Sequence, residues 1–218
     1  MEHTNEKHDA AAVLQKLSRG FLAKKQFARE AEARKAEDER SGVHAPFVPT
    51  PLKAIEVLRR DLLVDGDILC DLGCGDGRVL IECSPKLTKG IGVDIQEGPL
   101  ERARESTRSR MLKSELVWIH GDFRDPRVEA LLREEITVCF LFLLPEVVNN
   151  LVRYLTRTMR LGTRIVCYTF QITNLYNAGF SEDYEWEPSR VLNVPDLPTG
   201  VCKLYEYTIT EEAKTAAG

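Results

Sequence analysis

The sequence predicts an α/β fold in which a doubly wound, mostly parallel sheet of seven strands carries helices on both faces. Short apolar runs alternate with amphipathic helical patterns from residue 45 to residue 210, as expected for parallel strands joined by right-handed crossovers. The first apolar run, Asp67–Leu72, ends in the turn Gly73-Cys74-Gly75-Asp76-Gly77, and such a turn opens the ligand crevice of dinucleotide-type folds. Two strand patterns near the C-terminus predict an antiparallel hairpin that closes the sheet.

The changes in composition along the chain predict three segments. Its 218 residues, 43% of them hydrophobic, suffice for one α/β domain and an appendage. We expect a helical extension with a linker over residues 1–44, the α/β domain over residues 45–210 and a flexible tail over residues 211–218.

The first helix of the domain is predicted over Leu52–Leu62, where Leu52, Ile55, Leu58 and Leu62 fall on one face. Thr50 is a plausible N-cap residue and Pro51 a plausible first helical residue. The other elements follow from apolar runs and from 3.6-residue spacing. We expect strands at Asp67–Asp71, Gly90–Asp94, Glu115–His120, Ile136–Leu144, Thr163–Phe170, Glu185–Val194 and Val201–Ile209, and helices at Val79–Cys83, Leu100–Leu112, Arg127–Glu134 and Glu146–Met159.

Charge and cysteine usage narrow the function classes. A net charge of -4 and a pI near 5.7 give no general attraction to nucleic acid or to an anionic membrane. The six cysteines include no Cys-x-x-Cys pair, and four of them lie in apolar runs, so we expect reduced core thiols and neither a metal site nor a disulfide framework. We expect no secretory signal and no membrane span, and therefore a cytoplasmic protein, with a mitochondrial location as the alternative.

Acidic residues end or follow the first three predicted strands. Ligands of such sheets bind beyond the carboxyl ends of the strands, which singles out Asp71, Asp94 and Asp122. A carboxylate accepts two hydrogen bonds from a diol, so Asp94 suits a ribose. Asp122 has a second interpretation, as a turn residue or a helix cap before the Arg127 helix.

The segment Asp71-Leu72-Gly73-Cys74-Gly75-Asp76-Gly77, then Asp94, then Gly121-Asp122-Phe123, resembles the motif series of class I (seven-strand) S-adenosylmethionine-dependent methyltransferases, which are Rossmann-like. The resemblance covers residues 45–209. The third glycine comes one residue earlier than in the Gly-x-Gly-x-x-Gly loop of nicotinamide enzymes.

This resemblance implies S-adenosylmethionine as the cofactor and a role for each matching residue. The methionine end would contact Asp71 and the turn Gly73, Cys74, Gly75, Asp76 and Gly77, with Leu143 in the wall nearest the methyl group. The adenosine end would contact Asp94 at the ribose, Ile95 at the adenine face, Asp122 at the adenine amino group and Phe123 beside the ring.

Two further segments, Val48-Pro49-Thr50-Pro51 and Leu143-Leu144-Pro145-Glu146-Val147, resemble the small lysine-specific methyltransferases that modify the mitochondrial ATP synthase c subunit and the adenine nucleotide translocase. The resemblance implies a protein lysine as methyl acceptor. Unlike in the mitochondrial relatives, we expect no apolar N-terminal anchor here, which puts their substrates in doubt for this chain. A small-molecule methyltransferase and a non-catalytic adaptor remain alternatives.

Glu146 is the candidate catalytic residue. It either orients the amine and accepts its proton or favours the start of its helix through the helix dipole. An aromatic channel would lower the pKa of the acceptor amine, and six aromatic residues after the fifth strand are candidates, although three or four of them can instead belong to the core. They are Tyr168, Phe170, Tyr176, Phe180, Tyr184 and Trp186. His120 is expected to be structural.

Within the extension, residues 14–27 resemble the IQ motif that calmodulin and related EF-hand proteins bind. The positions that match are Leu14, Gln15, Arg19, Gly20, Lys24 and Phe27. No acidic residue occurs from Ala10 to Arg29, which suits an acidic groove. Docking on the chain's own domain, a solvated helix, and membrane or nucleic-acid binding are the alternatives.

Overall fold

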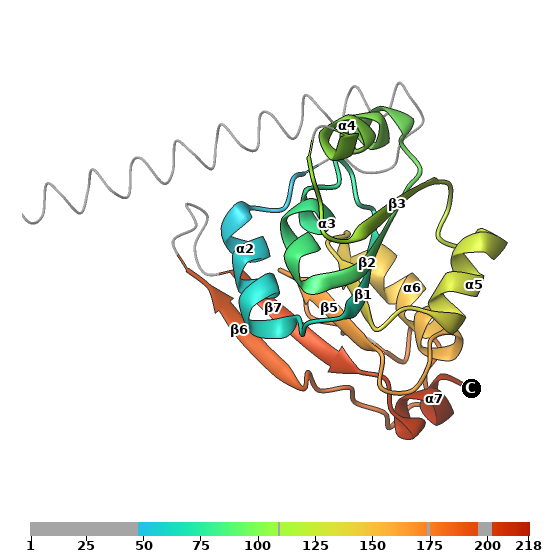
Figure 1. Ribbon diagram of the computed structural model, residues 1–218. Coiled ribbons are helices and arrows are strands. Elements are labelled where there is room, and N and C mark those ends of the chain that lie inside the picture. Colours follow the sequence, from blue (N-terminus) through green and yellow to red (C-terminus); the bar gives the residue numbers. More distant parts are fainter. Residues whose placement is uncertain (1–47, 109, 174, 196–201) are drawn as a thin grey trace, which may run out of the picture. The chain divides into compact units, whose positions relative to one another are not determined.

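A computed structural model describes residues 48–108, 110–173, 175–195 and 202–218. A seven-stranded sheet with the order β3-β2-β1-β4-β5-β7-β6 forms its centre (Figure 1). The strands are β1 Asp67–Leu72, β2 Leu87–Asp94, β3 Glu115–His120, β4 Val138–Leu141, β5 Arg164–Tyr168, β6 Arg190–Val194 and β7 Cys202–Thr208. β7 runs antiparallel to both β5 and β6, and the other neighbouring strands are parallel to each other. The predicted fold class is therefore confirmed.

Helices cover both faces of this sheet. They are α2 Leu52–Val57, α3 Arg78–Cys83, α4 Glu97–Arg108, α5 Pro126–Glu134, α6 Pro145–Thr158 and α7 Glu211–Ala217, with short helical turns η1 Leu58–Leu62 and η2 Ser84–Lys86. The right-handed crossovers place α3 and α4 on one face and α5 and α6 on the other. Figure 1 shows α2 beside α3, and α7 beside α6.

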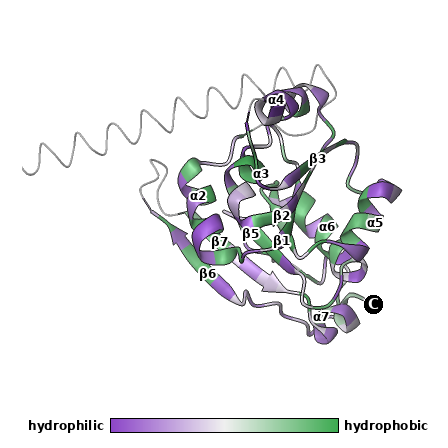
Figure 2. Cartoon of the chain, in the orientation of Figure 1, coloured by the Kyte–Doolittle hydropathy of each residue, from purple (hydrophilic) through white to green (hydrophobic). Residues whose placement is uncertain are grey.

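The core lies on both sides of the central strands. All four residues of β4 are buried, and five of the six residues of β1 are buried as well. Figure 2 shows apolar residues inside the molecule at β1 and β2, whereas α4 is largely hydrophilic and exposed. Among the described residues, no helix combines the length and apolar character that a bilayer crossing needs.

Four predicted strands are shorter in the structure, and β4 and β6 differ most from the prediction. β4 ends at Leu141 because Leu144 is already the N-cap residue of α6 and Pro145 is its first residue. β6 begins at Arg190, after Pro188, which has no backbone N–H to donate to a neighbouring strand.

α2 begins at Leu52 as predicted, but its N-cap residue differs from the prediction. Pro51 is the N-cap residue, in an extended conformation, and no side chain caps the helix, so the N-cap role expected for Thr50 is wrong. Thr50 is buried instead. Leu52 is 64% exposed, whereas Ile55 and Leu58 are buried as expected.

The expected flexible tail is also wrong, because residues 211–217 form α7. Thr210 caps this helix by accepting the backbone N–H of Ala213. Ala213 and Ala217 are buried, and the Nε of Arg153 donates to the Ala217 carbonyl at 2.8 Å. Small alanine side chains allow the helix to pack closely against α6.

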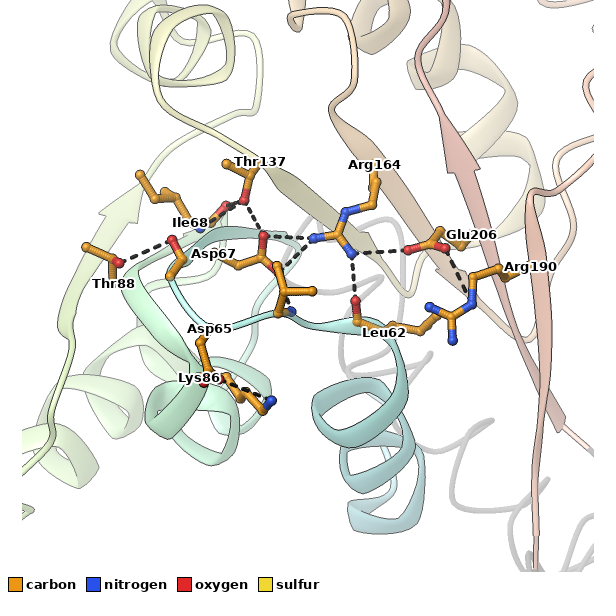
Figure 3. A network of polar contacts seen from close by, with 12 residues as sticks. Leu62, Asp65, Asp67, Ile68, Lys86, Thr88, Thr137, Arg164, Arg190 and Glu206 are labelled. Atoms are coloured by element: carbon orange, nitrogen blue, oxygen red, sulfur yellow. Dashed lines mark hydrogen bonds and ion pairs between the residues drawn. The ribbon is translucent and has the colours of Figure 1, made fainter.

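A buried network of charged groups joins the first residues of the parallel strands (Figure 3). Arg164, at the start of β5, donates to both carboxylate oxygens of Asp67, at 2.7 Å each, and to the Leu62 carbonyl at 2.6 Å. It also contacts Glu206 of β7 at 3.2 Å. Asp67 and Glu206 are both 4% exposed, so Arg164 connects the end of η1 to three strands at the sheet edge opposite the glycine turn.

We expect Arg164→Ala to lower the free energy of unfolding by about 3 to 5 kcal/mol, because the variant leaves the buried Asp67 carboxylate without its cation. Urea unfolding followed by circular dichroism measures the change. The control is Lys53→Ala, which removes an exposed ion pair with Glu56 and should cost about 0.5 kcal/mol or less. Equal losses in the two variants would contradict the structural role of Arg164.

Candidate active site

The turn after β1 has the conformation that its glycines predict. Gly73, Gly75 and Gly77 have φ angles of 84°, 53° and 73°, in the left-handed region that residues with a Cβ rarely adopt. Gly77 is the N-cap residue of α3. The chain therefore reverses from β1 into α3 within five residues, at the carboxyl edge of the sheet.

The space beside two of these glycines is filled by the protein itself. A Cβ on Gly77 would collide with the indole of Trp118 and with Ala103, and a Cβ on Gly73 would lie 2.7 Å from Cδ2 of Leu143. Close packing against β3 and α4 is therefore a second reason for a glycine at position 77, beside its left-handed backbone.

Asp94 links the ends of β1 and β2. Its Oδ2 accepts the backbone N–H of Gly75 at 2.7 Å, and its Oδ1 accepts that of Gln96 at 2.8 Å. The Val93 carbonyl accepts the N–H groups of Gly73 and Cys74. Each Asp94 oxygen keeps a second lone pair, so the carboxylate can still accept two hydrogen bonds from a diol.

Asp71 is a buried carboxyl group without a cation. It is 3% exposed, and no hydrogen-bond donor among the described residues reaches it. Burial raises the pKa of Asp71 to about 8, and the nearby charges of Asp94 and Asp76 add to the effect. A ligand cation placed beside this carboxylate would compensate it.

Asp76 and Cys74, in the turn that follows Asp71, have pKa shifts with different causes or consequences. Burial alone would raise the pKa of Asp76, but Arg78, which binds its two oxygens through Nε and Nη2 at 2.9 and 2.5 Å, lowers the pKa overall. Burial raises the pKa of the Cys74 thiol well above its ordinary value, so this thiol stays protonated. Asp76 is thus compensated by the protein, and Asp71 is not.

The end of β3 lies beside Asp94, whose carbonyl accepts the N–H of Gly121 at 3.0 Å. Asp122 is exposed and accepts the N–H of Arg124 at 2.7 Å, which makes it a turn residue. The helix cap is Asp125, which accepts the N–H of Arg127 at 2.8 Å. The alternative role of Asp122 as a helix cap is therefore wrong, and its carboxylate faces solvent near the end of β2.

His120 holds the loop that carries Ile95. Its Nε2 lies 3.0 Å from the Ile95 carbonyl, and its Nδ1 lies 3.0 Å from Oε2 of Glu97, whose other oxygen pairs with Arg104. These contacts agree with the structural role expected for His120. The side chain of Ile95 is 52% exposed, and Phe123 is partly buried beneath the guanidinium of Arg124.

The wall after β4 contains Leu143, which the sequence predicted there, and Phe142, which it did not single out. Leu143 packs on Gly73, and Phe142 contacts Tyr168 of β5 edge-on, with ring centroids 4.8 Å apart. The sequence predicts Phe142 inside the strand Ile136–Leu144, whereas β4 ends at Leu141. Thr169, at the end of β5, has a φ of 76°, a strained value that no sequence signal predicts.

Glu146 is exposed in the first turn of α6, so the structure leaves both of its interpretations open. Three of the candidate channel aromatics belong to the core instead. Phe180, Tyr184 and Trp186 pack on one another, and Trp186 also contacts Tyr207. Tyr168 is buried, Phe170 is partly buried and Tyr176 is 65% exposed. The IQ-like positions lie outside the described residues.

We expect Asp71→Asn to stabilise the protein, and more strongly at pH 8 than at pH 4.5. The ordinary pKa of 3.8 rises to about 8 on folding, so between these values the folded chain binds more protons than the unfolded chain, and stability falls as pH rises. The asparagine removes this penalty. Thermal unfolding should show a gain of about 5 °C or more at pH 8, and a pH-independent difference would contradict the assignment.

Comparisons with known proteins agree with this geometry. Residues 71–178 match the family described as the ANTKMT methyltransferase domain. A protein-lysine N-methyltransferase of Saccharolobus islandicus (strain REY15A) is 30% identical over 156 residues, which cover 70% of this chain and 87% of that protein.

Two solved structures show the same fold. An RNA methyltransferase from Salinibacter ruber, in complex with S-adenosyl-L-homocysteine, is 28% identical with a TM-score of 0.60, covering 76% of this chain and 95% of that chain. TrmK of M. capricolum, also with S-adenosyl-homocysteine, is 12% identical with a TM-score of 0.56, covering 72% and 67%. The chain therefore belongs to the family of protein-lysine N-methyltransferases with an ANTKMT methyltransferase domain, a group of class I S-adenosylmethionine-dependent methyltransferases.

Proposed function

We propose that this protein is a methyltransferase that transfers the methyl group of S-adenosylmethionine to the side-chain amine of a lysine in a protein. Its family and the name of its Saccharolobus islandicus relative support the lysine acceptor. The single structural observation that carries the proposal is the pair of acidic groups at the ends of β1 and β2. One of them, Asp71, lacks a cation, and the other, Asp94, keeps lone pairs for a diol.

The described residues fit S-adenosylmethionine at both of its polar ends. The ammonium group of the methionine part would provide the cation that Asp71 lacks, and the two ribose hydroxyls would donate to Asp94. Ile95 presents an exposed apolar side chain for the adenine, with Asp122 and Phe123 at the end of β3 beside it. Leu143, which packs on Gly73, would lie nearest the methyl group.

The bound cofactor supplies a methyl group that is already activated on a sulfonium. The protein has to orient the lysine amine, exclude water and remove the proton that this amine carries at neutral pH. Leu143, Leu144 and the Phe142–Tyr168 pair present apolar surface for excluding water. Glu146, exposed in the first turn of α6, is the group that we assign to orienting the amine and accepting its proton.

Two features, the net charge and the segment after β4, favour a protein over an RNA acceptor, although the Salinibacter ruber neighbour is described as an RNA methyltransferase. The chain has a net charge of -4, whereas RNA binding depends on basic surfaces. The segment after β4 reads Leu143-Leu144-Pro145-Glu146, not the Asn or Asp followed by Pro-Pro and an aromatic residue that is usual in DNA and protein amide methyltransferases, which disfavours a nucleobase and a glutamine as acceptors. The alternative acceptor is a small molecule.

The N-terminal extension suits a regulatory partner. Its IQ-like positions resemble the helix that calmodulin and EF-hand light chains bind, and we assign this partner to the extension on that sequence pattern alone. We place the protein in the cytoplasm, with the mitochondrion as the alternative location.

We expect the purified chain to transfer label from methyl-labelled S-adenosylmethionine to protein in a cell lysate, with the label recovered as methyl-lysine after acid hydrolysis. Asp94→Ala should abolish the transfer, because the ribose loses a charged acceptor worth about 1.5 to 3 kcal/mol per hydrogen bond. Glu146→Gln should lower kcat and leave cofactor affinity unchanged.

The matched control is Asp125→Asn, which changes a carboxylate at the start of α5 that caps the helix and is assigned no ligand. Label recovered only in RNA, or only in small molecules, would contradict the lysine acceptor. Wild-type cofactor affinity in Asp94→Ala would place the ribose elsewhere.

We expect deletion of residues 1–40 to abolish binding to immobilised calmodulin while cofactor affinity, measured by calorimetry, stays unchanged. The deletion removes every IQ-like position and none of the described residues. A truncated chain that still binds calmodulin would exclude the extension as the contact. A truncated chain that fails to fold would favour docking of the extension on the domain.

A further inference from the structure

A basic groove lies between α5 and α6, away from the cofactor residues. It has a volume of about 690 Å³ and is lined by Glu129 and Arg133 of α5, by Asn150, Arg153, Tyr154, Arg157 and Thr158 of α6, and by Ala178. We refer to it as the α5–α6 groove. None of these residues has a part in the proposed chemistry.

The charge of the groove is opposite to that of the whole chain. Three guanidinium groups face one carboxylate, which leaves a net charge of +2 in a protein whose total is -4. Burial raises the pKa of Tyr154, with a further contribution from the charge of Glu129, so this phenol stays neutral. The groove therefore attracts anionic groups in an otherwise acidic molecule.

The arginines of the groove are available to a ligand to different degrees. Arg133 is paired with Glu129. Arg153 donates its Nε to the Ala217 carbonyl, which fixes the position of its guanidinium. Arg157 is exposed, and its side chain makes no hydrogen bond or ion pair with the described residues. Of the three arginines, Arg157 is thus the one whose guanidinium is most available to bind an anionic partner.

Helix α6 connects this groove to the site of methyl transfer. It begins at Pro145, in the wall after β4, and a helix rises about 1.5 Å per residue. Asn150 therefore lies about 6 Å along the axis from Glu146, Arg153 about 10 Å and Arg157 about 16 Å. An extended peptide covers about 3.3 Å per residue, so about three residues span the distance to Arg153 and about five span the distance to Arg157.

We propose that the α5–α6 groove is a docking site for an acidic segment of the protein acceptor, about three to five residues from the target lysine. The inference rests on the proposed protein acceptor and adds a specificity determinant to it. Charge complementarity favours aspartate and glutamate side chains, and the groove is lined by later residues of α6, the helix that carries Glu146 in its first turn. Nothing in the proposed chemistry depends on these arginines, so their role is in recognition.

The first test is binding of a fluorescein-labelled hexaglutamate peptide to the full chain, measured by fluorescence anisotropy at low salt. Arg157→Glu should weaken binding at least fivefold, because it removes one ion pair and adds a repulsion at an exposed site. The matched control is Arg160→Glu, which makes the same charge change just beyond α6, where Arg160 contacts the Glu135 carbonyl outside the groove. The control should bind the peptide nearly as well as the wild type.

Asn150→Asp provides a second variant at an exposed groove position and should also weaken binding. In methylation assays, hexaglutamate should compete with the protein acceptor and not with S-adenosylmethionine. The binding measurement does not need activity, so failure of the proposed function and failure of this inference are distinguishable.

Three outcomes would overturn the proposal. The first is no peptide binding at 1 mM. The second is equal weakening by Arg157→Glu and Arg160→Glu, which would mean a general effect of surface charge. The third is tighter binding of a uridine hexanucleotide than of hexaglutamate with the same dependence on Arg157, which would assign the groove to nucleic acid.

Discussion

Asp71 lies buried at the end of β1 beside the carboxylates of Asp94 and Asp76, and within the described part of the chain only Asp76 of these three acids is paired with an arginine. A buried carboxyl group without a cation makes folding less favourable above its ordinary pKa. A side chain that is retained at such a cost is expected where a ligand supplies the missing charge. The ammonium group of S-adenosylmethionine has the sign that Asp71 requires, and the other features of the crevice are arranged around this contact.

The two buried aspartates of β1 show how the same residue type serves stability at one end of a strand and function at the other. Asp67, the first residue, is fully compensated by Arg164, which also reaches Leu62 and Glu206. Asp71, near the last residue, meets no cation among the described residues. The first arrangement holds the sheet edge and η1 together. The second leaves a carboxyl group without a positive partner at the edge where parallel sheets bind ligands.

Much of the fold could be predicted from the sequence because the signals are local. Apolar runs located all seven strands, and the glycine spacing located the turn after β1. What the sequence did not show depends on tertiary contacts. A Cβ on Gly77 would collide with the indole of Trp118, about 40 residues away, and the expected tail is α7, whose buried alanines lie beside α6. The α5–α6 groove likewise combines residues of separate helices, so neither helix alone predicts it.

The sequence predicted the part of the site that lies at the ends of the strands. Sequence order placed Asp71, Asp94 and Asp122 correctly at three neighbouring strand ends. It did not show that Asp76 pairs with Arg78, that Asp94 is already bound to the Gly75 and Gln96 amides, or that Phe142 faces Tyr168. Those facts follow from side-chain geometry, which a motif does not specify.

The most direct measurement is the number of protons released when S-adenosylmethionine binds at pH 7, obtained by titration calorimetry in buffers of different ionisation enthalpy. If the ammonium group lies against Asp71, whose pKa is about 8 in the free protein, binding forces this carboxyl group to ionise, and close to one proton should be released per cofactor. The release should disappear in Asp71→Asn. Binding without proton release in the wild-type protein, or with an unchanged release in the variant, would contradict the central claim.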